Sequence, residues 1–190
     1  MEFVITITGT APLLMHNSRL ANPLDPAAKA LKKVTGKRNK TDENHEEIAR
    51  LEHAGGLYYD PDLGPYIPGD NIWRALYDAA KKSKRGQRIK EGVFISSDIN
   101  PLVYDGPRTI DDLWADENYR LIASVKVGTS RTMRCRPRFP RWACRARGIL
   151  DTDLLDIDEL RDIATTAGSI VGLGDWRPRY GRFTATIEEA

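Results

Sequence analysis

The chain has 190 residues, of which 41% are hydrophobic and 29% are charged, and its formal net charge is +2. This composition is typical of a globular protein and excludes a disordered chain. The length fits one domain, or one domain with a large insertion. No apolar run approaches the roughly 18 residues of a membrane span. The only cysteines, Cys135 and Cys144, form no CxxC pair and are too few for a secreted disulfide scaffold. We therefore expect an intracellular protein without signal peptide, membrane contact, metal or cofactor.

The first half of the chain predicts one strand, a large insertion and one amphipathic helix. β-Branched residues at 3–9 are typical of a strand. The segment 17–56 lacks clear periodicity at first, and then predicts a surface helix that Thr41 or Asp42 caps and that runs to about His53. Asp70 is predicted to cap a helix over 71–82, because its apolar residues recur at helical spacing. A second loop region is expected at about 84–120, with short strands at 93–96 and 102–104 that are expected to pair with each other.

The second half predicts strands at 122–127, 132–139, 142–150 and 179–188, and a helix at 154–167. The pair 132–139 and 142–150 is expected to form a hairpin that turns near Phe139-Pro140, which would place Cys135 opposite Cys144. Without the insertions the order is βαββαβ. This order is typical of a ferredoxin-like α+β fold, with an antiparallel sheet and helices on one face. The other face of such a sheet is available for binding.

The low net charge hides a strongly basic segment. Between residues 131 and 147 there are seven arginines and no acidic residue, whereas 151–162 is mainly acidic. The arginines are Arg131, Arg134, Arg136, Arg138, Arg141, Arg145 and Arg147. Alternate residues of a strand share a face at steps of about 7 Å, so Arg134, Arg136 and Arg138 are predicted to form a row. Guanidinium groups bind phosphate and stack on bases, which indicates a nucleic-acid interface. The alternative is a solvated basic face that pairs with the acidic segment.

A glycine-rich segment near the C-terminus is the second candidate site. The amides of Gly172 and Gly174 are predicted to face phosphate. Arginines then alternate with aromatic residues in a pattern that suits base stacking and charge neutralisation. These residues are Trp176, Arg177, Arg179, Tyr180, Arg182 and Phe183. We expect one of the three aromatic residues to lie in the core. The alternative is a purely structural turn with Trp176 and Phe183 buried.

Signals for catalysis are few. His16, which follows the first strand, is the weak candidate for a general base. No nucleophile elbow, Walker motif or paired-carboxylate signature occurs in the sequence. The turn at 64–69 leads into a helix start that could bind an anion, although Asp70 would repel a phosphate there.

Three segments together resemble the RAMP superfamily, which includes CRISPR effector backbone and crRNA-processing subunits. Residues 9–16 resemble the family's first strand and its exit, and residues 65–76 resemble the "IPGSSLKGAL" start of its first helix. Residues 171–183 resemble its glycine-rich loop and final strand. The sequence differs from the family where Asp70-Asn71-Ile72 replaces serine-serine-lysine. The whole chain also resembles a group of small proteins from tailed bacteriophages and prophages.

The resemblance implies a ferredoxin-like core with an inserted thumb or palm, and RNA or single-stranded DNA held mainly through its backbone. It also implies self-association as a homo-oligomer or filament. We therefore predict a non-catalytic, phage-encoded protein that binds single-stranded nucleic acid in the cytoplasm of a bacterial host. Two alternatives stay open. One is a metal-independent endoribonuclease with His16 as its base, and the other is an inhibitor that mimics a subunit of a host defence complex.

Overall fold

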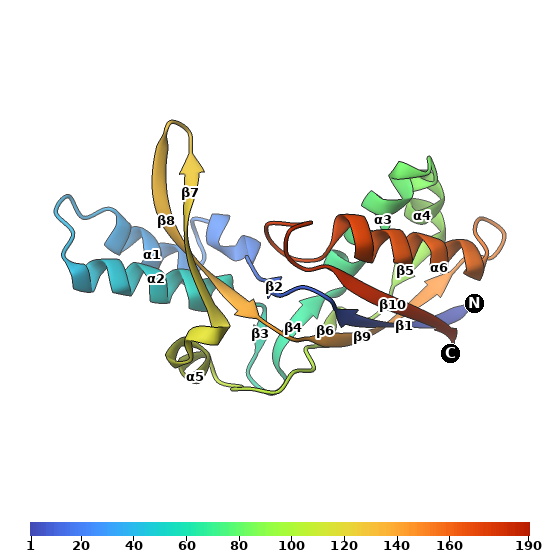
Figure 1. The fold of residues 1–190 in the computed structure, drawn as a ribbon, viewed down its shortest axis with the longest axis horizontal. Helices are drawn as coiled ribbons and strands as arrows, with labels where there is room; N and C mark the ends of the chain where they lie inside the picture. The colour runs from blue at the N-terminus through green and yellow to red at the C-terminus, as the bar shows by residue number, and fades with distance from the viewer. The chain divides into compact units, whose positions relative to one another are not determined.

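In a computed structural model the chain folds into two compact units. The structure describes residues 1–190, except for the side chain of Val127. The core unit comprises Met1–Leu13, Tyr59–Asp105 and Pro140–Ala190. The inserted unit comprises Leu14–Tyr58 and Gly106–Phe139. The elements of each unit can be followed by their labels in Figure 1.

The main sheet of the core unit has the strand order β10-β1-β9-β5, and every neighbouring pair is antiparallel. Its strands are β1 (Glu2–Gly9), β5 (Val93–Ile95), β9 (Ala143–Leu150) and β10 (Phe183–Glu189). Helix α3 (Gly69–Lys82) lies between β1 and β5 in the chain, and α6 (Ile157–Thr166) lies between β9 and β10. This arrangement confirms the predicted α+β class and its βαββαβ order.

One face of this sheet is buried and the other is open. Phe3, Ile5 and Ile7 alternate along β1 and are fully buried. In Figure 1 helices α3 and α6 lie on the same side of the sheet. Thr6 and Thr8, which point to the opposite face, are exposed. Because side chains alternate along a strand, burying one set under the helices leaves the other set on an open face.

The other elements of the core unit correct two predictions. They are β3 (Tyr59–Asp60), β4 (Gly64–Pro68), β6 (Ile99–Pro101), α4 (Gly86–Gly92) and a π-helical turn, η3 (Ala167–Val171). The prediction that 93–96 pairs with 102–104 is wrong, because β5 pairs with β9 and Val103 forms only a single bridge with Ala143. The prediction that Asp70 caps the helix is also wrong. The cap of α3 is Pro68 and Asp70 lies in the first turn, because helical backbone already begins at Gly69.

The inserted unit combines helices with a long β-hairpin (Figure 1). Its elements are η1 (Ser18–Ala21), α1 (Pro26–Thr35), α2 (Asp42–Gly56), α5 (Ile110–Ala115), η2 (Glu117–Tyr119), β7 (Arg120–Val127) and β8 (Ser130–Phe139), and the short strand β2 (Leu13–Leu14) precedes them. Thr41 caps α2, as predicted, and its hydroxyl accepts from the amide of Asn44.

The predicted hairpin around Phe139-Pro140 is wrong. Strand β8 pairs with β7 from Arg120↔Pro137 to Val127↔Ser130, whereas β9 pairs with β1 and β5. Gly128, with a φ of 60°, supplies the real turn, because glycine adopts this conformation without strain. Cys135 lies opposite Ile122 and Cys144 lies opposite Ile7, and both cysteines are free and buried.

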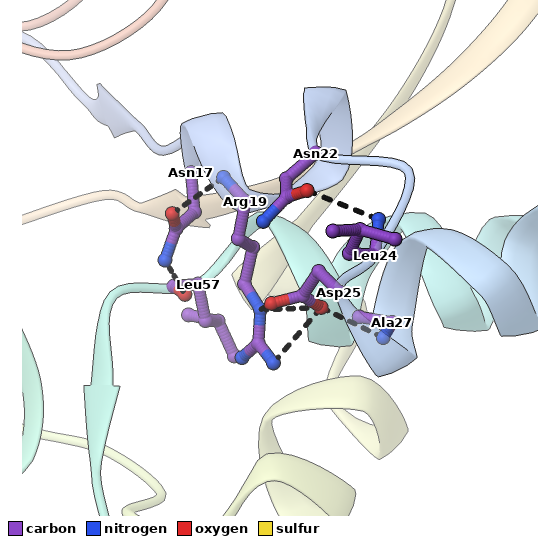
Figure 2. A network of polar contacts seen from close by, with 7 residues as sticks. All are labelled: Asn17, Arg19, Asn22, Leu24, Asp25, Ala27 and Leu57. Carbon is purple, nitrogen blue, oxygen red and sulfur yellow. Dashed lines mark hydrogen bonds and ion pairs between the residues drawn. The ribbon is translucent and has the colours of Figure 1, made fainter.

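Asn17 and Asp25 hold the first segment of the inserted unit in place (Figure 2). The Nδ2 of Asn17 donates to the carbonyl of Leu57 at 3.1 Å, which joins the two ends of this segment. The Oδ1 of Asn17 accepts from the amide of Arg19 at 3.0 Å. The side chain of Arg19 forms an ion pair of 3.2 Å with Asp25, and Asp25 caps α1 through the amide of Ala27. These polar contacts therefore fix the two ends of the segment and the start of α1.

Helix α2 is largely exposed over its first turns, as predicted for a surface helix, but its last turn buries polar residues. Glu52 is 3% exposed, and its carboxylate accepts from Nη1 of Arg134 at 2.8 Å and from the amide of Cys135 at 2.7 Å. His53 is fully buried, and its Nε2 lies 3.1 Å from the carbonyl of Tyr119. A carbonyl only accepts, so Nε2 carries the proton of the neutral ring. Burial lowers the pKa of His53 to about 4.

This buried histidine predicts a pH-dependent stability. The folded chain keeps His53 neutral down to a pKa of about 4, whereas the unfolded chain protonates it near 6.5. The unfolded state therefore binds more protons between these values, and stability is lost as the pH falls through this window. We expect the free energy of unfolding to fall by about 3 kcal/mol from this group alone. Urea unfolding at several pH values measures it. His53→Gln should remove this part of the pH dependence, and an unchanged dependence would contradict the prediction.

Candidate nucleic-acid interface

Two of the predicted arginines, Arg145 and Arg147, lie exposed on the open face of the core-unit sheet. They alternate along β9 with the buried residues Cys144 and Ala146. Arg145 lies opposite Thr6 of β1, and Ser97 accepts from the amide of Arg147 at 2.9 Å. Neither guanidinium forms an ion pair with any side chain that the structure describes. Both charges are therefore available to an external anion.

Around these arginines the open face carries threonine hydroxyls toward β10, where Glu188 also lies opposite Val4, and apolar side chains toward β5. Thr6 and Thr8 of β1 lie opposite Thr186 and Thr184 of β10, and all four are exposed. On the other side Phe94 of β5 lies opposite Ile149 of β9, and their exposed fractions are 62% and 45%. Sequence reasoning missed these residues, although the alternation of threonine with large apolar residues at 3–9 is a signal for an open face. We call this surface, including Arg145 and Arg147, the open-face patch.

The arginines of β8 do not form the exposed row that was predicted. Arg134 forms an ion pair of 2.8 Å with Glu52, which neutralises its charge. Arg136 is only 8% exposed, and its Nη1 donates to the carbonyl of Cys135 at 3.1 Å. Arg138 is half-buried, so of these β8 arginines only Arg131 is exposed. A carboxylate of α2 therefore pairs with Arg134 and packing covers Arg136, so these two arginines do not present free charges as the predicted row requires. Arg141, in the core unit, is exposed.

The glycine-rich segment folds back on itself. The amide of Gly172 donates to the carbonyl of Ala167 at 2.7 Å, and the amide of Leu173 donates to the carbonyl of Gly181 at 2.8 Å. Gly172, Gly174 and Gly181 have φ values of 78°, 74° and 69°. The amide of Gly172 is therefore occupied within the chain and does not serve the predicted phosphate site. The glycines allow a tight turn that only residues with positive φ can form.

The aromatic residues of this segment divide between core and surface. Phe183 is 4% exposed, with its ring centroid 6.5 Å from that of Trp142, so it is the aromatic residue that the core takes. Trp176 and Tyr180 are half-buried, and their ring centroids are 6.1 Å apart. The guanidinium of Arg179 lies 5.8 Å from the Tyr180 ring. These three residues keep the combination of charge and aromatic surface that the sequence predicts.

The remaining arginines of the segment have internal partners. Arg177 pairs with Asp78 of α3 at 3.2 Å. Asp78 also pairs with Arg74 and Lys81, each at 3.1 Å. Nε of Arg182 donates to the carbonyl of Pro178 at 2.9 Å. Arg177 is therefore a structural link to α3 as much as a candidate ligand.

The two remaining candidate features are the start of α3 and His16. The amide of Gly69 donates to the carbonyl of Asp98 at 3.0 Å, and Asp70 adds a negative charge in the first turn. Both work against anion binding at this helix start. His16 belongs to the inserted unit and is exposed. None of the described helices has the length and hydropathy that a membrane crossing needs.

Comparison with known proteins gives a likeness of fold. No family model matches the chain, and no curated protein does. A chain in the cryo-EM structure of the Type III-B Cmr-beta bound to cognate target RNA is similar, with a TM-score of 0.50 and 15% sequence identity. The match covers 98% of this chain but 59% of that chain. At this identity the similarity shows the α+β fold.

The glycine turn allows a matched test of backbone packing. A Cβ atom at Gly181 would lie 1.8 Å from the carbonyl oxygen of Leu173, whereas a Cβ at Gly128 meets nothing within 4 Å. Both glycines have positive φ. We expect Gly128→Ala to cost about 1 kcal/mol of unfolding free energy through backbone strain. Gly181→Ala should cost about 3 kcal/mol or more, because the clash adds to the strain. Urea unfolding of the two variants measures this, and equal losses would contradict it.

Proposed function

We propose that this chain is a non-catalytic protein that binds single-stranded RNA on the open-face patch of its core unit. The observation that carries the proposal is the pair of exposed arginines, Arg145 and Arg147, which have no carboxylate partner among the described side chains. They lie on the open face of a four-stranded antiparallel sheet. Sheets of this kind present RNA-binding surfaces in other modules. The fold similarity to a chain from an RNA-bound assembly supports the same function.

The chemistry of the open-face patch suits an extended strand of RNA. Residues two apart on a strand are about 7 Å apart, so Arg145 and Arg147 can reach successive phosphates. The four threonine hydroxyls can bond to phosphate and sugar oxygens, including the 2′-hydroxyl. Phe94 and Ile149 offer apolar surface against which bases can pack. Backbone contacts of this kind hold a strand with little dependence on its sequence.

Charge removal on the open-face patch tests the proposal. We expect the double variant Arg145→Ala/Arg147→Ala to bind a short RNA more weakly than the unchanged chain. The slope of log Kd against log salt concentration should fall by about 1.4, because each lost phosphate contact to a single strand removes about 0.7. Fluorescence anisotropy at several salt concentrations measures both quantities. A DNA strand of the same sequence, compared in parallel, tells whether the 2′-hydroxyl contributes.

The matched control removes two arginines from the helical side of the core unit. Arg88 on α4 and Arg161 on α6 are exposed and pair with Glu159 and Asp158. Their double alanine variant changes the net charge by the same amount but should keep the salt slope of the unchanged chain. Equal effects of the two double variants, or a Kd that does not depend on salt, would contradict the proposal.

We also propose that this chain is phage-encoded and that it assembles with copies of itself along its ligand in the cytoplasm of the bacterial host. The support is the sequence resemblance to relatives that coat a guide strand. Light scattering with RNAs of increasing length tests the assembly, and the complex should gain mass in steps of one chain of 21.4 kDa. A mass that stays at one chain per RNA, whatever its length, would contradict it.

A further inference from the structure

The inserted unit contains a cavity of about 770 Å³ that the open-face patch does not explain. It lies between α2 and the hairpin of β7 and β8, and the end of α1 and Trp114 of α5 complete its lining. Its volume falls within the range of about 300–1,000 Å³ that small-molecule sites occupy. The residues that carry the inference are Lys40, Ile48, Trp114, Ile122, Arg131 and Met133.

The walls of the cavity are largely apolar. Ile122 on β7 and Met133 on β8 are 48% and 57% exposed. Their register makes them diagonal neighbours on one face of the hairpin, because Ile122 lies opposite Cys135 and Met133 lies opposite Ser124. Ile48 of α2 adds a half-buried side chain to the lining. A flat apolar ligand would cover this surface.

Trp114 forms a wall that is held in position before any ligand arrives. Its ring lies edge-to-face with His53, with centroids 5.6 Å apart. The guanidinium of Arg120 lies 4.7 Å from the centre of the Trp114 ring, and Arg120 is itself held by an ion pair of 3.0 Å with Glu117. A ring fixed in this way binds a flat ligand with little loss of side-chain freedom.

The charges of the cavity favour an anionic ligand. Four cationic side chains line it, Lys40, Arg120, Arg131 and Arg134, against the carboxylates of Glu46 and Glu52. Arg134 neutralises Glu52. Lys40 donates to the carbonyl of Lys37, which leaves its charge uncompensated, and Arg131 has no carboxylate partner among the side chains that the structure describes. The cavity therefore combines apolar walls, an aromatic ring and excess positive charge.

We propose that this cavity binds an unstacked base of single-stranded RNA, with the base between Trp114, Ile122 and Met133. Lys40 and Arg131 hold the flanking phosphates. This inference rests on the proposed function, because it adds a base-binding site to a chain whose open-face patch holds the backbone. Single-stranded RNA is bound by unstacked bases that pack on aromatic and guanidinium planes, and Trp114 with Arg120 supplies both. Thr132 and His45 also line the cavity and offer hydrogen-bonding groups for the base edge.

The test combines a variant of the cavity with a change in the ligand, so that four pairs of protein and strand are compared. The unchanged chain and the variant Ile122→Ala/Met133→Ala are titrated with a short uridine oligonucleotide and with an abasic strand of the same length and charge. We expect the unchanged chain to bind the uridine strand about ten-fold more tightly, because base packing is lost in the abasic strand. The cavity variant should lose most of this preference, because only the apolar surface of Phe94 and Ile149 then remains for the bases. It should keep its salt slope, because the variant removes no charge. Such non-additivity is the signature of a direct contact.

A control variant and a second measurement show whether a lost preference comes from the cavity. Leu24 is 75% exposed in the same unit and does not line the cavity, so Leu24→Ala should keep the ten-fold preference. Photo-crosslinking of an iodouridine strand gives a second readout on the unchanged chain, and crosslinks are expected at Trp114 or within 131–135. Circular dichroism verifies that each variant folds. Should the cavity variant fail to fold, the crosslinks alone decide.

The outcomes separate this inference from the proposed function. Salt-dependent binding with no preference for bases, or with crosslinks only in the core unit, would overturn the cavity proposal and leave the open-face patch standing. An absence of RNA binding would overturn both. An acidic amphipathic peptide that binds the unchanged chain and not the cavity variant, with no base preference, would overturn the proposal in favour of a protein ligand.

Discussion

The alternation of side chains along the central strand β1 is the constraint on which the core unit depends. Phe3, Ile5 and Ile7 are fully buried, and β1 pairs with β9 on one side and with β10 on the other. Since the register of an antiparallel pair decides which residues share a face, these pairings also place Arg145 opposite Thr6 and Arg147 opposite Val4. The same packing that forms the core therefore creates the open-face patch. A shift of one residue in this register would bury both guanidinium groups.

A buried carboxylate ties two elements of the inserted unit together beside its apolar core. Glu52 accepts from the side chain of Arg134 and from the backbone of Cys135, so it ties α2 to β8 through two different groups. A buried charge is stable only when it is paired and hydrogen-bonded. The ion pair with Glu52 neutralises Arg134, one of the three arginines of the predicted phosphate row. It also holds α2 against the hairpin, on either side of the cavity that we propose as a base site.

Arginine-rich sequence and arginine-rich surface are therefore different things in this protein. Arg134 and Arg177 are paired with carboxylates, and Arg136 is buried. Arg145 and Arg147 are exposed because alternate side chains of β9 point to the open face. The high number of arginines in this part of the sequence is not the cause. The glycine-rich segment shows the same distinction. Its glycines are needed because their φ angles are positive and because the backbone of Leu173 lies close to Gly181. The amide of Gly172 already donates to a carbonyl of the chain.

Local pattern by itself determined the α+β class, the βαββαβ order and the helices at 42–53, 71–82 and 154–167, because apolar periodicity reflects burial one element at a time. It also identified Arg145 and Arg147 as candidates. Strand pairing was beyond its reach. The segment 132–139 was expected to pair with 142–150, yet β8 pairs with β7 and β9 pairs with β1. Pairing, ion pairs such as Glu52 with Arg134, and the cavity around Trp114 join residues far apart in the chain. Only the tertiary structure decides them, because their energies depend on which distant groups the fold brings within contact.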